Sequence, residues 1–320
     1  MKIILIGSFL DDWSTNNEMF KALQSLNHDV IKFDYRKDQK KPNFIYFIVD
    51  KFFSFGRRFD LISHLFINIY TSILGRKKIV RNVLKLIKKE EPDLIIVCKC
   101  DTLKIKTLEK YKDKLIYYFM DPLKMAKKIR TDINSSYCKY SISTFGKVSK
   151  NLMFSDHNRH YLQGVDKNIF NIKVPWEKRK DKIVFVANIT TKRKKFINFF
   201  KKQSIPIDCY GLGWENSQIY LKDLNFIYNE YKYVLNLCQD NYGFSVRVQQ
   251  AISSGCVVFS DYCQDFKTFT DLLRNFYSFN NQYDFKDLWN QRKNIFYSEN
   301  IPDLSWSKIM NENFKWINSQ

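Results

Sequence analysis

The stretch YVLNLCQDNYGFSVRVQQAISSGCVVFSDY, residues 233–262, decides the fold. Its apolar run 233–237 predicts a short buried strand, and segment 245–253 has the apolar spacing of a helix that ends at Gly255. The β-rich run 256–260 then returns to the sheet. Strand, glycine loop, helix and strand form a βαβ unit, whose loop directs backbone N–H groups and a helix N-terminus above the sheet. Such a site favours a phosphate.

Arg247 lies in the first turn of this predicted helix, where a cation opposes the helix dipole. A bound diphosphate would account for it, because Arg pairs with phosphate through two parallel hydrogen bonds. The alternative is an ordinary βαβ unit that carries an exposed Arg.

The stretch resembles the donor-site motif of GT-B glycosyltransferases, especially the group-1 and spore-maturation-type families. That motif has a glycine-rich loop, an Arg, a Glu and a Gly after the helix. The matching residues here are Gly243, Phe244, Ser245, Arg247, Gln250 and Gly255. Many group-1 enzymes have two Glu separated by seven residues, and this chain has Tyr242 and Gln250 at those places. The second Glu usually holds the ribose hydroxyls, and Gln can accept the same bonds without the charge.

Length and composition are those of a globular protein with two domains of ordinary size, or one large domain. The chain has 320 residues, 45% of them hydrophobic and 17% aromatic. No apolar run reaches transmembrane length, and the N-terminus lacks the pattern of a signal peptide. The seven cysteines are scattered and unpaired in spacing, so we expect buried free thiols in the cytoplasm. The four histidines are dispersed, and we expect no metal site.

The net charge of +20 raises the question of a polyanionic partner. Residues 1–170 carry 32 Lys and Arg against 18 Asp and Glu, so the basic excess lies mainly on the first half. The abundance of Lys, Ile, Asn and Phe is also what an AT-rich genome produces without selection for binding.

The chain begins with a Rossmann-like pattern: strand 2–8, helix 16–26 and strand 28–35. The glycines of a dinucleotide fingerprint are missing, so the pattern does not indicate NAD. In the family the first loop faces the cleft between the domains. The resemblance therefore implies that Ser8 and Trp13 contact the acceptor, while a structural role for each stays open.

Residues 42–89 are rich in Phe, Ile, Leu and basic side chains. They predict two or three amphipathic helices packed on the sheet, with their basic residues in solvent. The alternative is an interfacial surface that makes peripheral contact with an anionic membrane.

Residues 91–99 predict a strand, with Lys99 and Asp101 at its carboxyl edge on the expected acceptor side. The next strand, 115–122, ends in Asp121, in the crevice where α/β proteins place ligands. This segment resembles the family again, and also phage DNA β-glucosyltransferase, whose base is an Asp that ends a similar strand. The resemblance makes Asp121 the candidate catalytic base. A helix-capping role, with Pro122 at the first helical position, is the alternative.

Short strands are expected at 138–143 and 152–154. Residues 161–170 resemble the family's pre-linker signature, and the polar, basic segment 171–182 around Pro175 predicts the linker.

Strand 183–189, helix 190–202 and strand 205–211 predict a second Rossmann-like beginning. The family places a basic residue in this first turn against the donor diphosphate. Arg193 fits that role, with Lys192 as second choice. The alternative is a plain run of charges on a solvated face. The loop with Gly211 and Trp214 corresponds to the place where related enzymes approach the nucleotide base.

Three further helices are expected, at 265–274, 285–296 and 302–317. In GT-B enzymes a C-terminal helix crosses back to the first domain, and the apolar stripe of 302–317 suits that role.

The predicted fold is α/β, GT-B, with two facing Rossmann-like domains. The expected boundaries are 1–172 for the acceptor-side domain, 181–299 for the nucleotide-sugar domain and 300–320 for the crossing helix. The expected activity is transfer of a sugar from a UDP- or GDP-sugar to a hydroxyl of a glycan or lipid-linked acceptor in envelope glycan synthesis, with no cofactor or metal. Two alternatives stay open: a phage-type enzyme acting on a hydroxymethylated base of duplex DNA, and a non-catalytic nucleotide-sugar-binding module.

Overall fold

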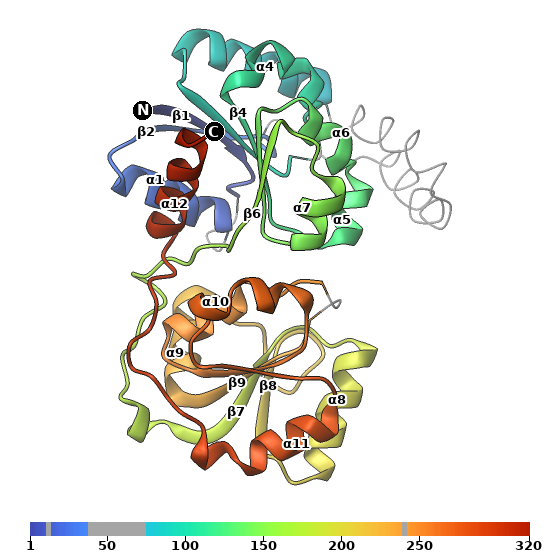
Figure 1. The fold of residues 1–320 in the computed structure, drawn as a ribbon, viewed down its shortest axis with the longest axis vertical. Coiled ribbons are helices and arrows are strands. Elements are labelled where there is room, and N and C mark those ends of the chain that lie inside the picture. The colour runs from blue at the N-terminus through green and yellow to red at the C-terminus, as the bar shows by residue number, and fades with distance from the viewer. Residues whose placement is uncertain (11–13, 38–74, 101, 239–241) are drawn as a thin grey trace. The chain divides into compact units, whose positions relative to one another are not determined.

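The computed structural model describes residues 1–10, 14–37, 75–100, 102–238 and 242–320 (Figure 1). Trp13, Asp101 and most of segment 42–89 lie outside the described residues. The chain divides into a first unit, Met1–Tyr161 with Asn313–Gln320, and a second unit, Leu162–Glu312. Among the described residues, no helix is both long and apolar enough to cross a membrane.

The first unit is built on a six-stranded sheet in which every strand pairing is parallel. Its strands are β1 (Lys2–Gly7), β2 (Asp29–Asp34), β3 (Leu94–Cys98), β4 (Leu115–Phe119), β5 (Tyr140–Ser143) and β6 (His157–His160). The spatial order is β2-β1-β3-β4-β5-β6, so the order reverses between β1 and β3. Ligands of such sheets bind beyond the carboxyl ends of the strands at this switch point.

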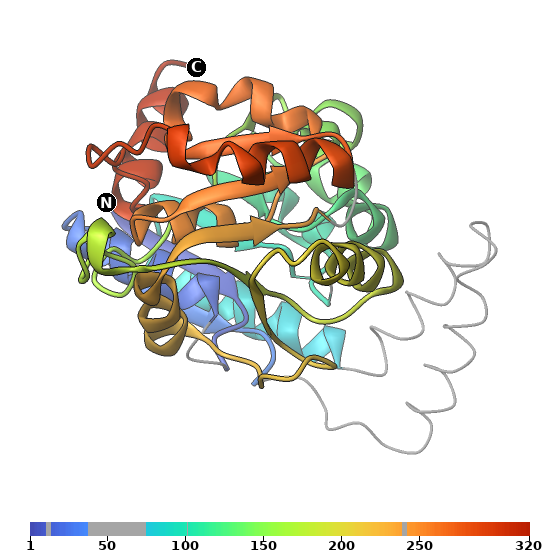
Figure 2. The same cartoon turned by 90° about the horizontal axis from the view of Figure 1, so that it is seen from below.

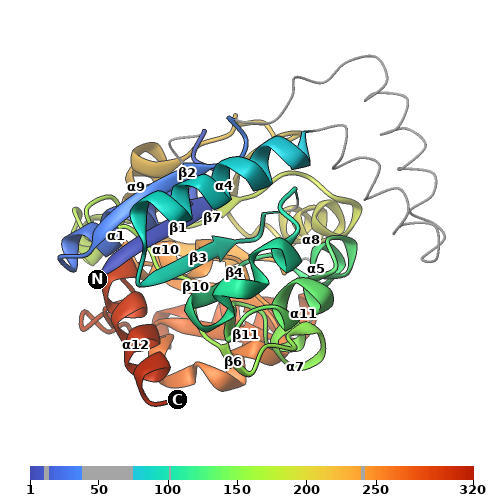
Figure 3. The ribbon, with the colours of Figure 1, turned by 90° about the horizontal axis from the view of Figure 1, so that it is seen from above.

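Helices cover both faces of the first sheet. They are α1 (Thr15–Ser25), α4 (Arg76–Glu90), α5 (Leu123–Lys128), α6 (Thr131–Ser136) and α7 (Gly146–Leu152), with a 3-10 segment η1 (Ile105–Lys114). On α4, Ile79, Val83 and Ile87 recur every four residues and are buried in the core formed with Ile4 and Ile95. Figure 3 shows α4 lying along β1 and β3.

The second unit has a five-stranded parallel sheet in the order β11-β10-β9-β7-β8. Its strands are β7 (Lys180–Val186), β8 (Ile207–Tyr210), β9 (Tyr231–Asn236), β10 (Val257–Asp261) and β11 (Phe276–Phe279). The order reverses between β7 and β9, which repeats the topology of the first sheet. These two doubly wound sheets confirm the predicted α/β fold of two Rossmann-like domains.

The second sheet also carries helices on both faces: α8 (Thr191–Lys202), α9 (Leu221–Glu230), α10 (Arg247–Ser253) and α11 (Gln282–Asn290). In Figure 1, α9 and α10 cover one face, and α8 and α11 cover the other. Figure 2 shows the orange-red α11 in front of the orange strands of this sheet. Phe200 of α8 and Phe285 of α11 are fully buried, with ring centroids 4.3 Å apart.

The last helix, α12 (Trp306–Asn318), begins in the second unit and ends in the first. Within the first unit, the Phe314 ring meets the edge of His28, with centroids 5.2 Å apart. The Arg159 guanidinium donates a hydrogen bond of 3.1 Å to the Asn313 side chain. Within the second unit, the backbone of Val165 pairs with that of Ser305 just before the helix begins.

Several element predictions were wrong in detail. Leu152 ends helix α7, and the strand expected at 152–154 is instead β6, a few residues later. The helix expected at 265–274 is two short 3-10 turns, η3 (Gln264–Thr268) and η4 (Thr270–Leu272). The helix expected at 285–296 begins earlier, as α11, and is followed by the 3-10 turn η5 (Arg292–Asn294). The expected linker contains η2 (Trp176–Lys178), and β7 already begins at Lys180.

Candidate functional site

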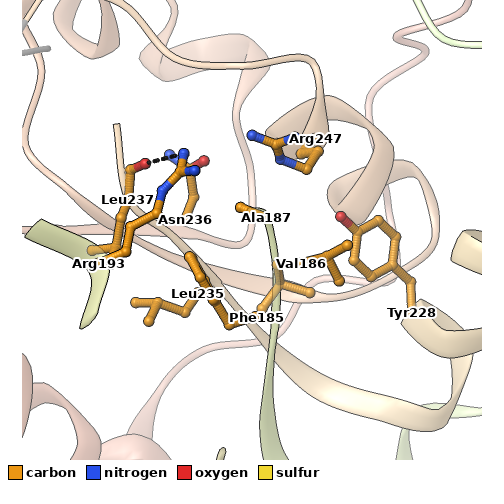
Figure 4. Close-up of a pocket in the computed structure, with 10 residues that line it drawn as sticks. Phe185, Val186, Ala187, Arg193, Tyr228, Leu235, Asn236, Leu237 and Arg247 are labelled. Atoms are coloured by element: carbon orange, nitrogen blue, oxygen red, sulfur yellow. Dashed lines mark hydrogen bonds between the residues drawn. The ribbon is translucent and has the colours of Figure 1, made fainter. Parts of the chain in front are cut away.

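A small pocket lies at the switch point of the second sheet, where β7 and β9 end side by side (Figure 4). It is lined by Phe185, Val186 and Ala187 at the end of β7, Val234, Leu235, Asn236 and Leu237 at the end of β9, and Arg193, Tyr228 and Arg247 from the helices. No acidic side chain is among these lining residues. The topology and the charge both mark this edge as a place for an anion.

Arg193 is fixed by the start of α8. The Thr190 hydroxyl caps this helix by accepting the backbone N–H of Arg193 at 3.3 Å. The guanidinium donates to the carbonyl of Asn188 at 2.8 Å and to that of Leu237 at 3.3 Å, and the residue is only 6% exposed. Burial, and then the nearby charge of Arg247, lower the pKa of Arg193 to about 10. The protein therefore holds a desolvated cation that an anionic ligand would stabilise.

Arg247 is the first residue of α10 and points into the same pocket as Arg193 (Figure 4). Its guanidinium makes no ion pair with any acid in the part of the chain that the structure describes. Two like charges are thus brought together. The helix itself has seven residues, beginning later than expected, so the attraction for an anion rests on the two guanidinium groups rather than on the helix dipole.

Tyr228 and Asn236 complete the pocket, and the sequence analysis did not single out either. The Tyr228 hydroxyl is buried and has no hydrogen-bond partner among the described residues, and burial raises the pKa of this tyrosine. The Asn236 amide donates to the Ser260 hydroxyl at 2.8 Å. A polar residue that ends the apolar run of β9 was a usable signal for Asn236. No sequence signal distinguished Tyr228 from the other residues of its amphipathic helix.

Lys192 has a different environment from Arg193. Its ammonium lies 2.6 Å from the carboxylate of Asp261 and donates to the carbonyl of Cys238 at 3.1 Å. The second oxygen of Asp261, a residue only 5% exposed, accepts the backbone N–H of Cys238 at 2.6 Å. These contacts fasten the start of α8 and the end of β9 to β10. The charge of Lys192 is thus already neutralised by a buried carboxylate.

Residues 242–246, directly before α10, are anchored by an aromatic cluster. The ring of Phe244 is buried and stacks on Phe266, with centroids 4.8 Å apart. Gly243 is buried, and Ser245 and Tyr242 are half-buried. The Ser245 hydroxyl donates weakly, at 3.5 Å, to the side-chain oxygen of Asn236. Phe244 thus holds the loop in place, next to the pocket residue Asn236.

Gln250 lies on the first full turn of α10, with 9% of its surface exposed. It does not line the pocket of Arg193 and Arg247. Its backbone carbonyl accepts the hydroxyl and the backbone N–H of Ser254.

The loop after β8 packs onto the end of β7. The indole N–H of Trp214 donates to the carbonyl of Ala187 at 2.7 Å. Gly211 has φ +131°, and a Cβ there would lie 2.6 Å from the same carbonyl oxygen. Gly211 is therefore required by a close backbone approach, and Trp214 braces the wall of the pocket.

Lys99 and Asp121 come together at the carboxyl edge of the first sheet. Lys99 directly follows β3, Asp121 lies two residues after β4, and their side chains form an ion pair of 2.8 Å with about one third of each exposed. Lys99 and Cys100 both have positive φ, and the Tyr117 hydroxyl donates to the Lys99 carbonyl at 3.1 Å. Strained backbone of this kind concentrates at functional sites.

The capping alternative for Asp121 is wrong in this structure. The N-cap of α5 is Pro122, with no side-chain capping bond, and Pro122 does not occupy the first helical position. Asp121 is thus an accessible carboxylate held by Lys99.

Ser8 follows β1 on the other side of the same switch point. Its carbonyl accepts the Ser14 hydroxyl at 2.7 Å and the Asn16 amide at 3.0 Å, so its backbone organises the start of α1.

Comparisons with known proteins agree with this architecture. Residues 192–294 match the family model described as "Glycosyl transferase-like". A search of curated proteins found no match. Among solved structures, Anabaena HepE in complex with UDP-glucose is similar over 100% of both chains, at 9% identity and a TM-score of 0.61. AviGT4, a glycosyltransferase involved in avilamycin A biosynthesis, is similar over 99% of this chain and 97% of its own, at 9% identity and a TM-score of 0.57.

A glycosyltransferase from Rickettsia africae is similar over 99% of this chain and 98% of its own, at 11% identity and a TM-score of 0.55. At such identities the likeness establishes the fold, and the match over 192–294 includes seven of the ten residues named above as lining the pocket. The chain thus has the GT-B fold, and its segment 192–294 is similar to glycosyltransferases.

Proposed function

We propose that this protein transfers a sugar from a nucleotide-sugar donor to an acceptor hydroxyl, with the donor diphosphate bound between Arg193 and Arg247. The observation that carries the proposal is the convergence of these two guanidinium groups in one pocket, where no acid occurs among the lining residues that the structure describes. Arg193 is already buried in the folded protein, so a diphosphate would not have to remove water from this cation when it binds. Folding has already met that free-energy cost.

The chemistry of transfer needs negative charge stabilised on the leaving diphosphate as the sugar–phosphate bond breaks. Two fixed guanidinium groups can supply this as preorganised electrostatic stabilisation. Bidentate pairing would also orient the diphosphate, which places the sugar carbon for attack. The crystal structure of the similar Anabaena HepE contains UDP-glucose, which supports a UDP-sugar as the first donor to test.

The first unit presents the acceptor in this proposal. Asp121 takes the proton of the attacking hydroxyl, and Lys99 holds its carboxylate in an accessible orientation. Ser8 lies at the same carboxyl edge and contributes to acceptor binding. The acceptor class that we favour is a glycan or lipid-linked hydroxyl of envelope synthesis, in keeping with the family resemblance of the donor motif.

The general test is a panel of UDP- and GDP-sugars in a thermal-shift assay, since a ligand that binds only the folded protein raises its melting temperature. Hydrolysis of the stabilising donor in the absence of acceptor is the expected second result. Binding of a donor without any turnover, in the presence of glycan, lipid-linked and hydroxymethylated DNA acceptors, would instead favour the non-catalytic binding module.

Gln250 is proposed to hold the ribose as an uncharged replacement for Glu. Gln250→Ala should weaken UDP binding several-fold, because removal of a neutral hydrogen bond typically costs about 0.5–1.5 kcal/mol. Gln250→Glu should bind UDP as well as the parent protein or more tightly. Calorimetric titration with UDP measures both, and Gln249→Ala is the neighbouring control. Equal affinity of Gln250→Ala and the parent protein would remove Gln250 from the donor site.

A further inference from the structure

A groove of about 770 Å³ lies between α4 and η1 in the first unit, and none of its described lining residues is assigned to either substrate. Eleven described residues line it, of which seven are Lys or Arg and none is acidic. The groove is therefore a concentrated positive surface on the half of the chain that carries most of the basic excess.

The cations come from two separate elements. On α4, the exposed side chains of Lys77, Arg81, Lys85 and Lys88 follow one another at helical spacing. Lys104, just before η1, and Lys110 within it supply the opposite wall. Within the described part of the chain, none of these six side chains forms an ion pair with an acid.

The placement of the basic residues on α4 destabilises this helix. Its first turn carries no acidic residue and begins with Arg76, Lys77 and Lys78, so cations lie where the helix dipole is positive. Like charges along one face repel as well. Folding alone gives no reason for this pattern, whereas an anionic partner would stabilise it.

The floor of the groove is apolar. Val80 and Leu84 are half-buried against the core, and the ring of Tyr111 lies beside them, with the Lys110 ammonium 4.8 Å from its centroid. A cationic rim over an aliphatic and aromatic floor matches an amphiphile, whose phosphate meets the rim and whose glycerol and upper acyl carbons meet the floor. Duplex DNA has regularly spaced phosphates but no aliphatic part to cover such a floor.

We propose that the groove between α4 and η1 is a docking surface for a membrane rich in acidic phospholipid. Clusters of four to eight basic residues on an amphipathic helix bind such surfaces, each cation adding to the affinity. The long aliphatic stems of the lysines can lie on the apolar surface while their ammonium groups reach the headgroups. This docking is independent of donor binding and of catalysis.

The test is co-sedimentation of the full chain with vesicles of phosphatidylcholine alone, or with about one third phosphatidylglycerol. We expect binding to the acidic vesicles only, and a steep loss of binding as salt is raised. Arg81→Gln/Lys85→Gln on α4 and Lys104→Gln/Lys110→Gln on the other wall should each weaken binding on the order of tenfold. All four side chains are exposed on the first unit, so circular dichroism should show an unchanged fold.

The matched control is Lys267→Gln/Lys293→Gln, which removes two exposed lysines from the second unit. It should bind acidic vesicles like the parent protein. If all three variants lost the same amount of vesicle binding, the binding would depend on the net charge of the protein and not on the groove. That result would overturn the proposal. Equal binding to neutral vesicles would also overturn it, as would vesicle binding that survives in both groove variants while binding to duplex DNA is lost.

Discussion

Turnover of Asp121→Asn is expected to fall by a factor on the order of 10²–10⁴, the usual contribution of a general base. Asparagine keeps the shape of the side chain and can still contact Lys99, but it cannot take a proton. Donor affinity should remain that of the parent protein, because the Arg193 and Arg247 pocket belongs to the other unit. The measurement is initial rate at saturating donor, alongside melting temperature and UDP affinity.

Asp156→Asn is the matched control for this experiment. Asp156 forms a similar ion pair, at 2.7 Å from Lys112, in the same unit, but it lies before β6 rather than at the switch-point edge. Its loss should leave turnover near that of the parent protein. If both variants retain turnover, Asp121 has no part in proton transfer.

The donor affinity of Arg247→Ala is expected to fall by about one to two orders of magnitude, equivalent to about 1.5–3 kcal/mol for hydrogen bonds to a charged group. The fold should be unaffected or slightly stabilised, since the substitution removes repulsion from Arg193. Titration with UDP and with the best nucleotide sugar measures the change. Arg274→Ala, also in the second unit but outside the pocket, is the control.

Arg193→Lys provides the complementary experiment. Lysine keeps the charge but loses the fork that reaches both the Asn188 and Leu237 carbonyls, so donor affinity should fall while the melting temperature also drops. If Arg193→Lys and Arg247→Ala both bind UDP like the parent protein, the diphosphate lies elsewhere and the donor site must be reassigned.

The sequence was sufficient to predict the parts of the fold that local pattern controls. Apolar runs such as 2–7 and 115–119 are strands buried on both faces, and this burial makes them continuous rather than alternating. Gly255 ended α10 where expected, in the left-handed conformation with φ +81°. Arg247 was singled out because a cation in the first turn of a helix needs an explanation, and Arg193 because the resembling family has a basic residue in that turn.

The features that the sequence did not predict share one physical origin. Each depends on contacts with residues that lie elsewhere in the chain. Strand β6, HNRH, is an edge strand with half-exposed polar residues, so it shows no apolar run. Residues 264–272 have helical spacing, but Phe266 is drawn onto Phe244 and Phe276, and two 3-10 turns result. The buried contact of Asp261 with Lys192 spans 69 positions, which no local pattern reveals.

The last eight residues, Asn313–Gln320, belong to the first unit although 151 residues of the second unit, Leu162–Glu312, precede them. During synthesis on a ribosome, the first unit therefore emerges long before the residues that cover His28 and Arg159 exist. The second unit is contiguous and can complete its core without waiting for other segments. The unit whose synthesis begins first is thus the one whose residues are complete last. Removal of Asn313–Gln320 would therefore damage the amino-terminal unit.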